Sequence, residues 1–377
     1  MSEFRLPGVT YFGWGVVEKV GEEAARLGRR ALLVTGRSAM QQTGTGARVT
    51  ALLAAAGVEV IPFPGVESDP RHSTVDRGAA FAREQQCDLV IGLGGGSPMD
   101  AARAIAGMAT MEGSVLEYLR GKAIDRPGLP LISISTTSGT ASEITAVAVV
   151  LDEPRELKMG IRSPYWFARV AITDAELTAT MPPAVTAATG LDALTHAVES
   201  YLATGATPPS EALALRSIAT IGQHLPAAYA DGANRAAREG MAMGSMLAGM
   251  AFANSGLGLV HGLVHPIGAR QGLAHGNACG RLLPYVLRFN QPAVEAKLAD
   301  VGAALTGKPK TTAEGAIAAV EALVKAVDVP LGLRDVAITE EELRGLAKDG
   351  LLSGAVRTNP RPVSEEESLG VLRASRA

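Results

Sequence analysis

The first half of the chain alternates short apolar runs with longer amphipathic segments. The apolar runs are rich in Val, Ile and Leu and have the length of buried strands; they cover residues 31–35, 58–63, 88–93, 131–135 and 171–174. The amphipathic segments carry apolar residues at helical spacing, at residues 16–27, 48–56 and 73–85. Strands that alternate with helices predict a parallel sheet with helices on both faces.

From about Pro182 onward the pattern changes to long stretches rich in Ala, Leu and Met. Residues 209–227 and 238–254 show helical periodicity and few β-branched runs, so the second half is predicted to be almost entirely helical. A chain of 377 residues exceeds what one core usually supports. We therefore predict two domains, an α/β domain over residues 1–178 and a helical domain over residues 179–377.

Composition and charge narrow the class of protein. The chain is 47% hydrophobic and 19% charged, which is typical of a compact globular protein, and its net charge of −3 provides no field for nucleic acid or an anionic membrane. No apolar stretch has the length of a membrane span, and the residues after Met1 lack the apolar core of a signal peptide. With only two cysteines, we expect a cytoplasmic protein with reduced thiols and neither nucleic-acid nor membrane partners.

Histidines are concentrated in the second half. Five of the six lie between positions 196 and 275, and Asp192 stands four residues before His196. His261 and His265 repeat this spacing, which on a helix puts both side chains on one face, and His275 follows in a Gly-flanked turn. Core or surface histidines are the alternative, but one carboxylate with several imidazoles favours a divalent transition-metal site. Cys279 could be a further ligand, although a small buried thiol is the simpler interpretation.

Two polar loops follow predicted strands in the first half. Gly94, Gly95, Gly96 and Ser97 lie between a strand and a helix, where glycines let backbone N–H groups approach a phosphate, and Ser97 is expected to cap the helix. A plain tight turn is the alternative. Residues 135–143 are rich in hydroxyl side chains that could bind ribose and pyrophosphate oxygens, or simply form a turn. Together the loops favour a dinucleotide, although neither the Gly-x-Gly-x-x-Gly fingerprint nor a Walker loop is present.

Four motifs together resemble the iron-containing, group III alcohol dehydrogenases. They are Gly-Gly-Gly-Ser-Pro-Met-Asp at 94–100, Ser-Thr-Thr-Ser-Gly-Thr-Ala-Ser-Glu-Ile-Thr at 135–145, Gly-Leu-Asp-Ala-Leu-Thr-His-Ala-Val-Glu at 190–199, and the histidine segment 261–275. The resemblance covers about residues 12–361 and implies a Rossmann-like α/β domain, as in dehydroquinate synthase, followed by an all-α domain. It also implies hydride transfer between NAD(P)H and a small alcohol or aldehyde, and a homodimer or larger homo-oligomer.

The resemblance assigns roles to individual residues. It makes Asp192, His196, His261 and His275 the metal ligands and places His265 beside the nicotinamide, where it is our candidate for relaying the alkoxide proton. Phe252 corresponds to an aromatic of the substrate pocket. The residues implied to bind the cofactor are Gly94, Gly95, Gly96, Ser97, Asp100, Thr136, Thr137, Thr140 and Lys158.

Three positions depart from the family pattern. The family usually has Pro where Ser135 stands and Gly where Ala141 stands, and we expect only local adjustment there. Many NAD-specific members carry Asp where this chain has Gly36. An acidic group would repel a 2′-phosphate, whereas Arg37 or Ser38 could bind it, so we predict a preference for NADP(H) over NAD(H).

The ligand set leaves the metal and the reaction partly open. Three imidazoles and a carboxylate suit Fe²⁺, which the resemblance implies, and also Zn²⁺ or another divalent transition metal. A maleylacetate-reductase-like activity would need arginines in the pocket, and near the histidines only Arg270 is evident. A glycerol-dehydrogenase-like enzyme and a catalytically idle NAD(P)-binding protein are further alternatives, and the second is disfavoured because buried ligands without a metal would be costly.

Overall fold

A computed structural model describes residues 3–377 and divides the chain into two compact units. The sheet unit comprises Arg5–Thr137 and Ala141–Thr180, and the helical unit comprises residues 3–4, Ser138–Thr140 and Met181–Ala377. The sequence places its domain division after residue 178, and the chain leaves the sheet unit after Thr180. The short excursion of Ser138–Thr140 into the helical unit is not evident from the sequence pattern.

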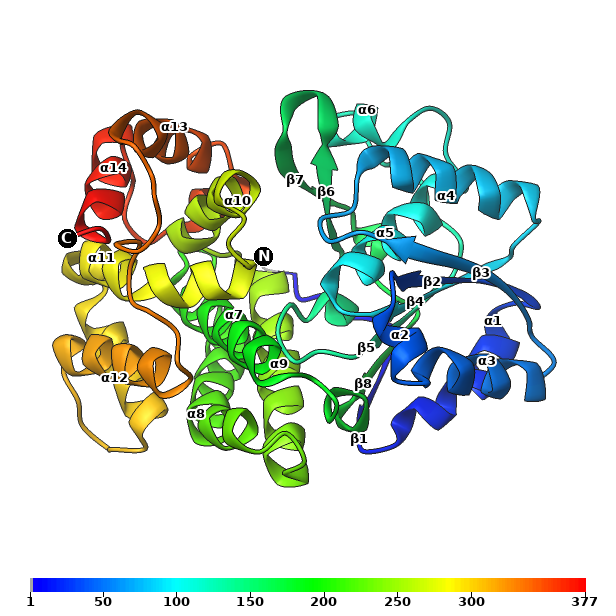
Figure 1. Ribbon diagram of the computed structural model, residues 1–377, viewed down its shortest axis with the longest axis horizontal. Coiled ribbons are helices and arrows are strands. Elements are labelled where there is room, and N and C mark those ends of the chain that lie inside the picture. Colours follow the sequence, from blue (N-terminus) through cyan, green and yellow to red (C-terminus); the bar gives the residue numbers. More distant parts are fainter. Residues whose placement is uncertain (1–2) are drawn as a thin grey trace. The chain divides into compact units, whose positions relative to one another are not determined.

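The sheet unit is built on a six-stranded parallel sheet, as the alternating pattern predicts (Figure 1). The strand order is β1-β8-β5-β4-β2-β3, and every pairing is parallel. The strands are β1 (Val9–Gly13), β2 (Arg30–Gly36), β3 (Glu59–Val66), β4 (Leu89–Gly94), β5 (Leu131–Ser135) and β8 (Val170–Asp174). The predicted α/β fold is thereby confirmed for this part of the chain.

Helices cover both faces of this sheet because neighbouring strand residues point to opposite sides. Leu33 packs in one core cluster with residues of α1 (Val20–Leu27) and α3 (Thr45–Ala55). Leu32 packs in the other cluster with residues of α4 (His72–Glu84) and α5 (Gly96–Met108). The short helices α2 (Ala39–Gln42) and α6 (Val115–Leu119) complete the unit.

Three strands were not predicted from the sequence. β1 is an edge strand whose residues are only partly buried, so it lacks a continuous apolar run. β6 (Val147–Asp152) and β7 (Leu157–Arg162) form a separate antiparallel pair. β6 alternates buried and half-buried residues, which is the pattern of a strand with one face toward a core.

The helical unit confirms the prediction for the second half of the chain. Its helices are α7 (Pro183–Leu202), α8 (Pro208–Ala230), α9 (Arg235–Ser255), α10 (Leu259–Gln271), α11 (His275–Thr306), α12 (Ala313–Ala326), α13 (Glu340–Gly350) and α14 (Glu365–Ala374). α7 packs against α8, α9 and α11 and is buried along most of its length. It therefore forms the centre of the unit's core.

Within the described residues, no helix taken singly has the length and apolar character of a membrane span. α9 and α10 satisfy those criteria only when taken together, and they are bent by 108° relative to each other.

Candidate active site

The central helix α7 presents three buried polar side chains on one face. Asp192, His196 and Glu199 follow one another at intervals of four and three residues, so they project from the same side of the helix. All three are buried. Burying two carboxylates and an imidazole is costly unless hydrogen bonds or opposite charges compensate the loss of water.

The other two histidines implied as ligands lie at the starts of two helices. His261 lies in the first turn of α10, which begins directly after Gly258, and His275 is the first residue of α11. Gly276 allows α11 to approach α7 closely, because a Cβ at this position would overlap the carbonyl oxygen of Ala188. This close approach brings His275 next to Asp192.

Four groups converge on one oxygen of Asp192. Its Oδ1 lies 3.7 Å from His196 Nδ1, 3.7 Å from His261 Nε2, 3.6 Å from His275 Nε2 and 3.6 Å from Cys279 Sγ. The three nitrogen distances are too long for hydrogen bonds. They are close to the separation of about 3.4 Å expected between two ligands that each lie about 2.1 Å from one tetrahedral ion.

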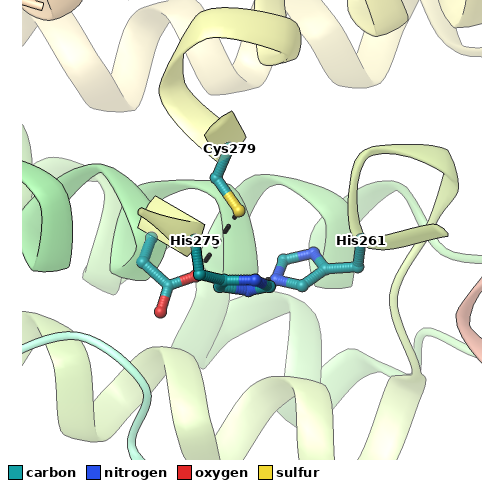
Figure 2. Close-up of side chains that lie close together, drawn as sticks. His261, His275 and Cys279 are labelled. Atoms are coloured by element: carbon teal, nitrogen blue, oxygen red, sulfur yellow. Dashed lines mark hydrogen bonds and ion pairs between the residues drawn. The ribbon is translucent and has the colours of Figure 1, made fainter. Parts of the chain in front are cut away.

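The tightest group in the cluster differs slightly from the implied ligand set. The ligand atoms of Asp192, His261, His275 and Cys279 all lie within 4.8 Å of one another (Figure 2). His196 is outside that group but equally close to Asp192, and its ring stacks at 4.4 Å on the ring of His261. The structure thus brings all four implied ligands together and adds Cys279, which the sequence left as a buried thiol.

The residues fit a divalent cation. His196 Nδ1 and His261 Nε2 are buried, and among the described residues neither atom has a hydrogen-bond partner. Leaving such atoms unsatisfied costs about 1–3 kcal/mol each. An ion between them and Asp192 would satisfy both atoms and neutralise the carboxylate.

The pKa values reflect this crowding of charged groups. Burial alone would raise the pKa of Asp192, but His196, His275 and His261 lower it overall. Burial lowers the pKa of His196 to about 3, so its ring is neutral at pH 7. Burial also opposes the charge on His261, yet the carboxylates of Asp192 and Glu199 raise its pKa to about 9. A proton is therefore held at His261, where a cation would have to displace it.

Cys279 is a neutral hydrogen-bond donor in this cluster. Burial and the charges of Asp192 and Glu199 raise the pKa of its thiol well above the usual value. The Sγ–H group accordingly donates to Asp192. The structure shows both Cys279 and Cys87 as buried, free cysteines.

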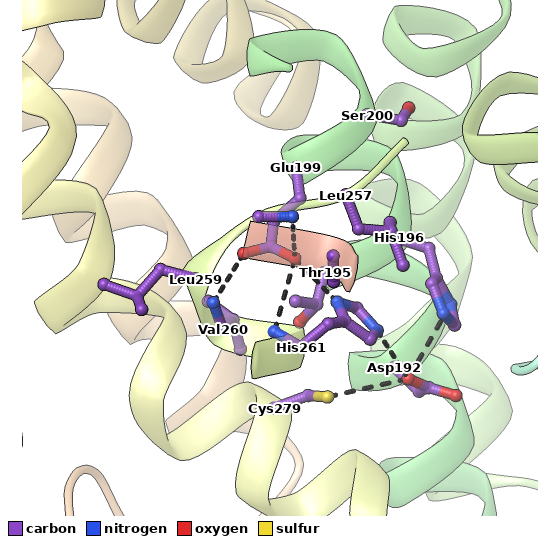
Figure 3. A network of polar contacts seen from close by, with 12 residues as sticks. Asp192, Thr195, His196, Glu199, Ser200, Leu257, Leu259, Val260, His261 and Cys279 are labelled. Carbon is purple, nitrogen blue, oxygen red and sulfur yellow. Dashed lines mark hydrogen bonds and ion pairs between the residues drawn. The ribbon is translucent and has the colours of Figure 1, made fainter. Parts of the chain in front are cut away.

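Glu199 is a functional residue that the sequence analysis missed. Its carboxylate accepts a 2.6 Å hydrogen bond from His261 Nδ1 and further bonds from backbone N–H groups at the start of α10 (Figure 3). The signal was present, because Glu199 lies seven residues after Asp192 on the same face of α7. Its partners, however, lie about 60 residues further along the chain, where local spacing gives no information.

The hydroxyl-rich loop also contacts the cluster. Gly139 belongs to the segment Ser138–Thr140 of the helical unit, and its backbone forms a hydrogen bond with the ring of His196. Thr140 lies in the same segment. The loop that the sequence assigned to a dinucleotide thus also orients a histidine of the cluster.

His265 and Phe252 border the cluster. Phe252 stacks on the ring of His196 at a centroid distance of 4.4 Å. The ring of His265 meets that of His275 edge-on at 5.4 Å, and His265 is half-buried. The side chain of His275 is 34% exposed, so the cluster is accessible from this side.

The predicted cofactor residues gather at one edge of the sheet unit. Gly36, Gly94 and Ser135 end β2, β4 and β5, which are neighbouring strands, and Thr136 N–H donates to the Gly94 carbonyl. Gly94 has φ +145°, and a Cβ there would lie 2.6 Å from Pro98. Ligands of open α/β sheets bind at this edge.

The helix after this loop does not begin as predicted. α5 starts at Gly96 with Gly95 as its N-cap, so Ser97 is not the capping residue. Ser97 Oγ instead accepts a hydrogen bond from Asp69 N–H. The backbone turns into the helix earlier because its three glycines allow it.

Asp100 and Lys158 are engaged within the sheet unit. Asp100 accepts hydrogen bonds from Arg103, from Ser142 Oγ at 2.6 Å and from Val149 N–H, so its carboxylate fixes the base of the loops. Lys158 pairs with Asp69 at 2.7 Å, next to Ser97.

Thr137 lies beside Gly95, with its side chain 3.4 Å from the position of a Cβ. At the end of β2, Arg37 and Ser38 are exposed, and a Cβ at Gly36 would meet only the Val66 carbonyl, at 3.8 Å. An aspartate would therefore fit at position 36, and the absence of an acidic group there is not imposed by space.

Comparison with known proteins assigns this arrangement to a family. Residues 186–376 match the C-terminal model of the Fe-containing alcohol dehydrogenase family, and residues 7–175 match the model of iron-containing alcohol dehydrogenases. The two matches together cover the sheet unit and the helical unit.

Individual relatives agree over the full length. The chain is 38% identical over 380 residues to a 1,3-propanediol dehydrogenase of Klebsiella pneumoniae, covering 99% of this chain and 98% of that protein. It is 34% identical over 379 residues to an NAD-dependent methanol dehydrogenase of Bacillus methanolicus, covering 99% of each. A crystal structure of a 1,3-propanediol oxidoreductase superimposes with a TM-score of 0.96 at 38% identity, covering 100% of both chains.

Proposed function

Since the chain belongs to the family of iron-containing alcohol dehydrogenases, we propose that it transfers hydride between NADP(H) and a small primary alcohol or aldehyde at the Asp192 cluster. The observation that carries this proposal is the convergence of three imidazole nitrogens on one carboxylate oxygen, where two of these nitrogens are buried and have no hydrogen-bond partner among residues 3–377. The names of the relatives, which act on 1,3-propanediol and methanol, support a short primary alcohol as substrate.

Asp192, His196, His261 and His275 would hold the metal, which we propose to be Fe²⁺, with Zn²⁺ as the other candidate. When bound, a divalent cation polarises the oxygen of the aldehyde or alcohol as a Lewis acid. The charges favour this occupancy, because a dication would be balanced by the two buried carboxylates Asp192 and Glu199.

The other residues of the cluster orient groups and move a proton. Phe252 stacks on His196 and would restrict both that ring and the alkyl part of the substrate. His265 is proposed to exchange the alcohol proton with solvent, because it is half-buried, borders His275, and has an imidazole ring, which can both accept and donate a proton. A His265→Ala variant that retained both the rate and the pH profile would exclude this relay.

The sheet unit would bind the cofactor through its loops. Gly94, Gly95, Gly96 and Ser97 supply backbone N–H groups and a helix start for the pyrophosphate, with Asp100 fixing the loop from within. Thr136, Thr137 and Lys158 of this unit are proposed to lie along the ribose and adenine, and the same role is proposed for Thr140, which belongs to the helical unit.

The absence of an acidic side chain at Gly36, beside the exposed Arg37 and Ser38, supports NADP(H). Gly36→Asp should lower kcat/KM with NADPH at least tenfold relative to NADH, because a carboxylate repels a 2′-phosphate. If the ratio of kcat/KM with NADPH to kcat/KM with NADH were the same in the wild type and in Gly36→Asp, the proposed preference for NADP(H) would be refuted.

We also propose that the enzyme works in the cytoplasm as a homodimer or larger homo-oligomer. The two free, buried cysteines fit a reducing compartment. Light scattering of the purified protein would measure the oligomeric state, and a monomer would contradict the proposal.

Metal-dependent turnover is the direct test of the main proposal. Metal-stripped protein is assayed anaerobically for NADPH oxidation with butanal and with 3-hydroxypropanal, before and after addition of Fe²⁺. Activity that requires Fe²⁺ or Zn²⁺ supports the mechanism, whereas equal activity without metal overturns it. An Asp192→Asn variant is the control, because it keeps the size of the side chain but removes the charge that attracts the ion.

The maleylacetate-reductase alternative has no specific support in the described residues. Arg270, the arginine that the sequence associated with it, is paired with Asp349. It is therefore not a free cation for a dicarboxylate substrate.

A further inference from the structure

Glu199 does more than compensate the charge of a neighbour. Its two oxygens accept hydrogen bonds from Gly258 N–H at 3.0 Å, Val260 N–H at 2.7 Å and His261 Nδ1 at 2.6 Å. The same carboxylate lies 3.4 Å from the His261 backbone nitrogen. A single side chain from α7 thus holds both the backbone and the ring of a residue on α10.

The ring contact determines which nitrogen of His261 can bind an ion. A carboxylate can only accept, so at 2.6 Å from Glu199 the Nδ1 atom must carry the proton. With Nδ1 protonated, the lone pair of the neutral ring is at Nε2, the buried atom that faces Asp192 and has no hydrogen-bond partner among the described residues. The opposite tautomer would direct an N–H group at the site instead.

We propose that Glu199 is a positioning residue that fixes His261 in the Nδ1–H tautomer and so sets the affinity of the site for its metal ion. This inference rests on the proposed function, because it takes the Asp192 cluster as the metal site. Removal of a carboxylate that orients a metal-bound histidine typically weakens metal binding by about 10- to 100-fold.

A purely structural role is the competing explanation, since Glu199 also caps α10. The chain supplies a matched control in Asn359, whose Oδ1 accepts a 3.1 Å hydrogen bond from Leu259 N–H in the same first turn. Asn359 has its other hydrogen bonds with Asn290 and Arg361 and none with the His261 ring among the described residues. Asn359→Ala therefore weakens the helix start while leaving the ring contact in place.

The test measures metal binding directly. Co²⁺ is titrated into metal-stripped wild type, Glu199→Gln and Asn359→Ala, and the dissociation constant is obtained from the visible absorption of the bound ion. In Glu199→Gln one of the two oxygens becomes an N–H₂ donor, so the side chain can no longer accept from both His261 Nδ1–H and Val260 N–H. We expect the dissociation constant to rise about 10- to 100-fold for Glu199→Gln and to change by less than about threefold for Asn359→Ala.

The possible results separate the two proposals. Absence of Co²⁺ binding in the wild type would overturn the proposed function itself. If the wild type binds Co²⁺ and Glu199→Gln binds it with the same affinity, the role of Glu199 alone is overturned. If Asn359→Ala loses as much Co²⁺ affinity as Glu199→Gln, the role of Glu199 is also overturned, because only the start of α10 then matters.

A second measurement applies even if Glu199→Gln does not fold. In Zn²⁺-loaded wild type with ¹⁵N-labelled histidine, nuclear magnetic resonance should show one strongly downfield proton on an Nδ1 atom that exchanges slowly with water. A proton on Nε2 of His261, or none on Nδ1, would contradict the proposal.

Discussion

The starts of α5 and α10 are built in opposite ways. At α5, the N-cap is Gly95, and among the described residues no side chain accepts from the N–H groups of Gly95, Gly96 or Ser97. At α10, Glu199 and Asn359 accept from the N–H groups of Gly258, Leu259 and Val260. One helix start is open and the other is closed by the protein itself.

The difference follows from what each start is proposed to hold. A helix N-terminus attracts anions because its unpaired N–H groups carry partial positive charge. The open start of α5 leaves that attraction to a ligand, and the glycines allow a phosphate to come close. The closed start of α10 uses it for the protein's own carboxylate, which then orients His261. In the proposed function, the same backbone feature would serve cofactor binding in one unit and metal binding in the other.

The comparison predicts that variants at the start of α5 affect nucleotide binding and that variants at the start of α10 affect metal binding. The largest effect is expected at α10. His261→Ala removes a ligand nitrogen and should reduce kcat/KM by about 10³-fold or more, since polarisation by the metal contributes several kcal/mol. Its affinity for NADPH, measured by fluorescence titration, should remain within about twofold of the wild type. A comparable loss of NADPH binding would show that the two starts are not independent.

Glu143 is a buried carboxylate that, unlike Glu199, does not accept hydrogen bonds from the first turn of an α-helix among the described residues, and it should make stability depend on pH. Glu143 is buried in the sheet unit and accepts from Thr173 Oγ1, and burial raises its pKa from the ordinary 4.5 to about 7. The folded protein then binds this proton more tightly than the unfolded chain, so the contribution of Glu143 to stability is fully present below pH 4.5 and falls by about 3 kcal/mol as the pH rises to 7.

Glu143→Gln should remove this contribution. Urea unfolding of the wild type and the variant between pH 5 and 7.5 measures it as the difference between the two slopes. Parallel slopes would mean that Glu143 is ionised in the folded protein throughout this range.

Before the open start of α5, Gly94→Ala tests whether the loop Gly94–Ser97 binds the pyrophosphate. The φ of +145° and the close contact with Pro98 make an alanine there strained, by about 1–3 kcal/mol, and the loop must move to relieve it. NADPH affinity should fall about tenfold while Co²⁺ affinity stays unchanged. Unchanged NADPH affinity would argue that the phosphate binds elsewhere.

The smallest effect is expected at Cys279. Asp192 and Glu199 already balance a dication, so the thiol has no electrostatic reason to ionise, and we expect it to remain a donor to Asp192. Cys279→Ser should change Co²⁺ affinity by less than about threefold, because a hydroxyl also donates. The spectrum of the Co²⁺ protein should lack an intense thiolate-to-metal band, and its presence would make Cys279 a ligand.

Sequence patterns predicted five of the six strands of the parallel sheet and missed β1, β6 and β7. The apolar runs of β2, β4 and β5 stand out because both faces of these strands are covered. β1 lies at the edge of the sheet, where its residues are only partly buried, whereas β6 contains an apolar run at 147–151 that the sequence analysis did not use. Length and periodicity were sufficient for the long helices of the second half.

At the site, the sequence identified residue types but not their contacts. The spacing of Asp192 with His196 and of His261 with His265 favoured a metal site, since metal chemistry restricts the residue types, and the family resemblance implied which of them are ligands. Ser97 was expected to cap α5, but the glycines before it start the helix earlier. Ala141 has φ +48°, a conformation that favours glycine, which accounts for the family's usual residue there and could not be inferred from this chain alone.

The closure of α10 by Glu199 and Asn359 also has a consequence for local opening of the backbone. Amide hydrogens in the first turn of a helix normally exchange quickly with solvent, because they have no partner within the helix. Those of Gly258, Leu259 and Val260 are tied to side chains from α7 and from the loop after residue 358, so their exchange requires those segments to separate. The first turn of α10 should therefore exchange as slowly as the core of the helical unit, whereas the first turn of α5 exchanges rapidly until a nucleotide is bound.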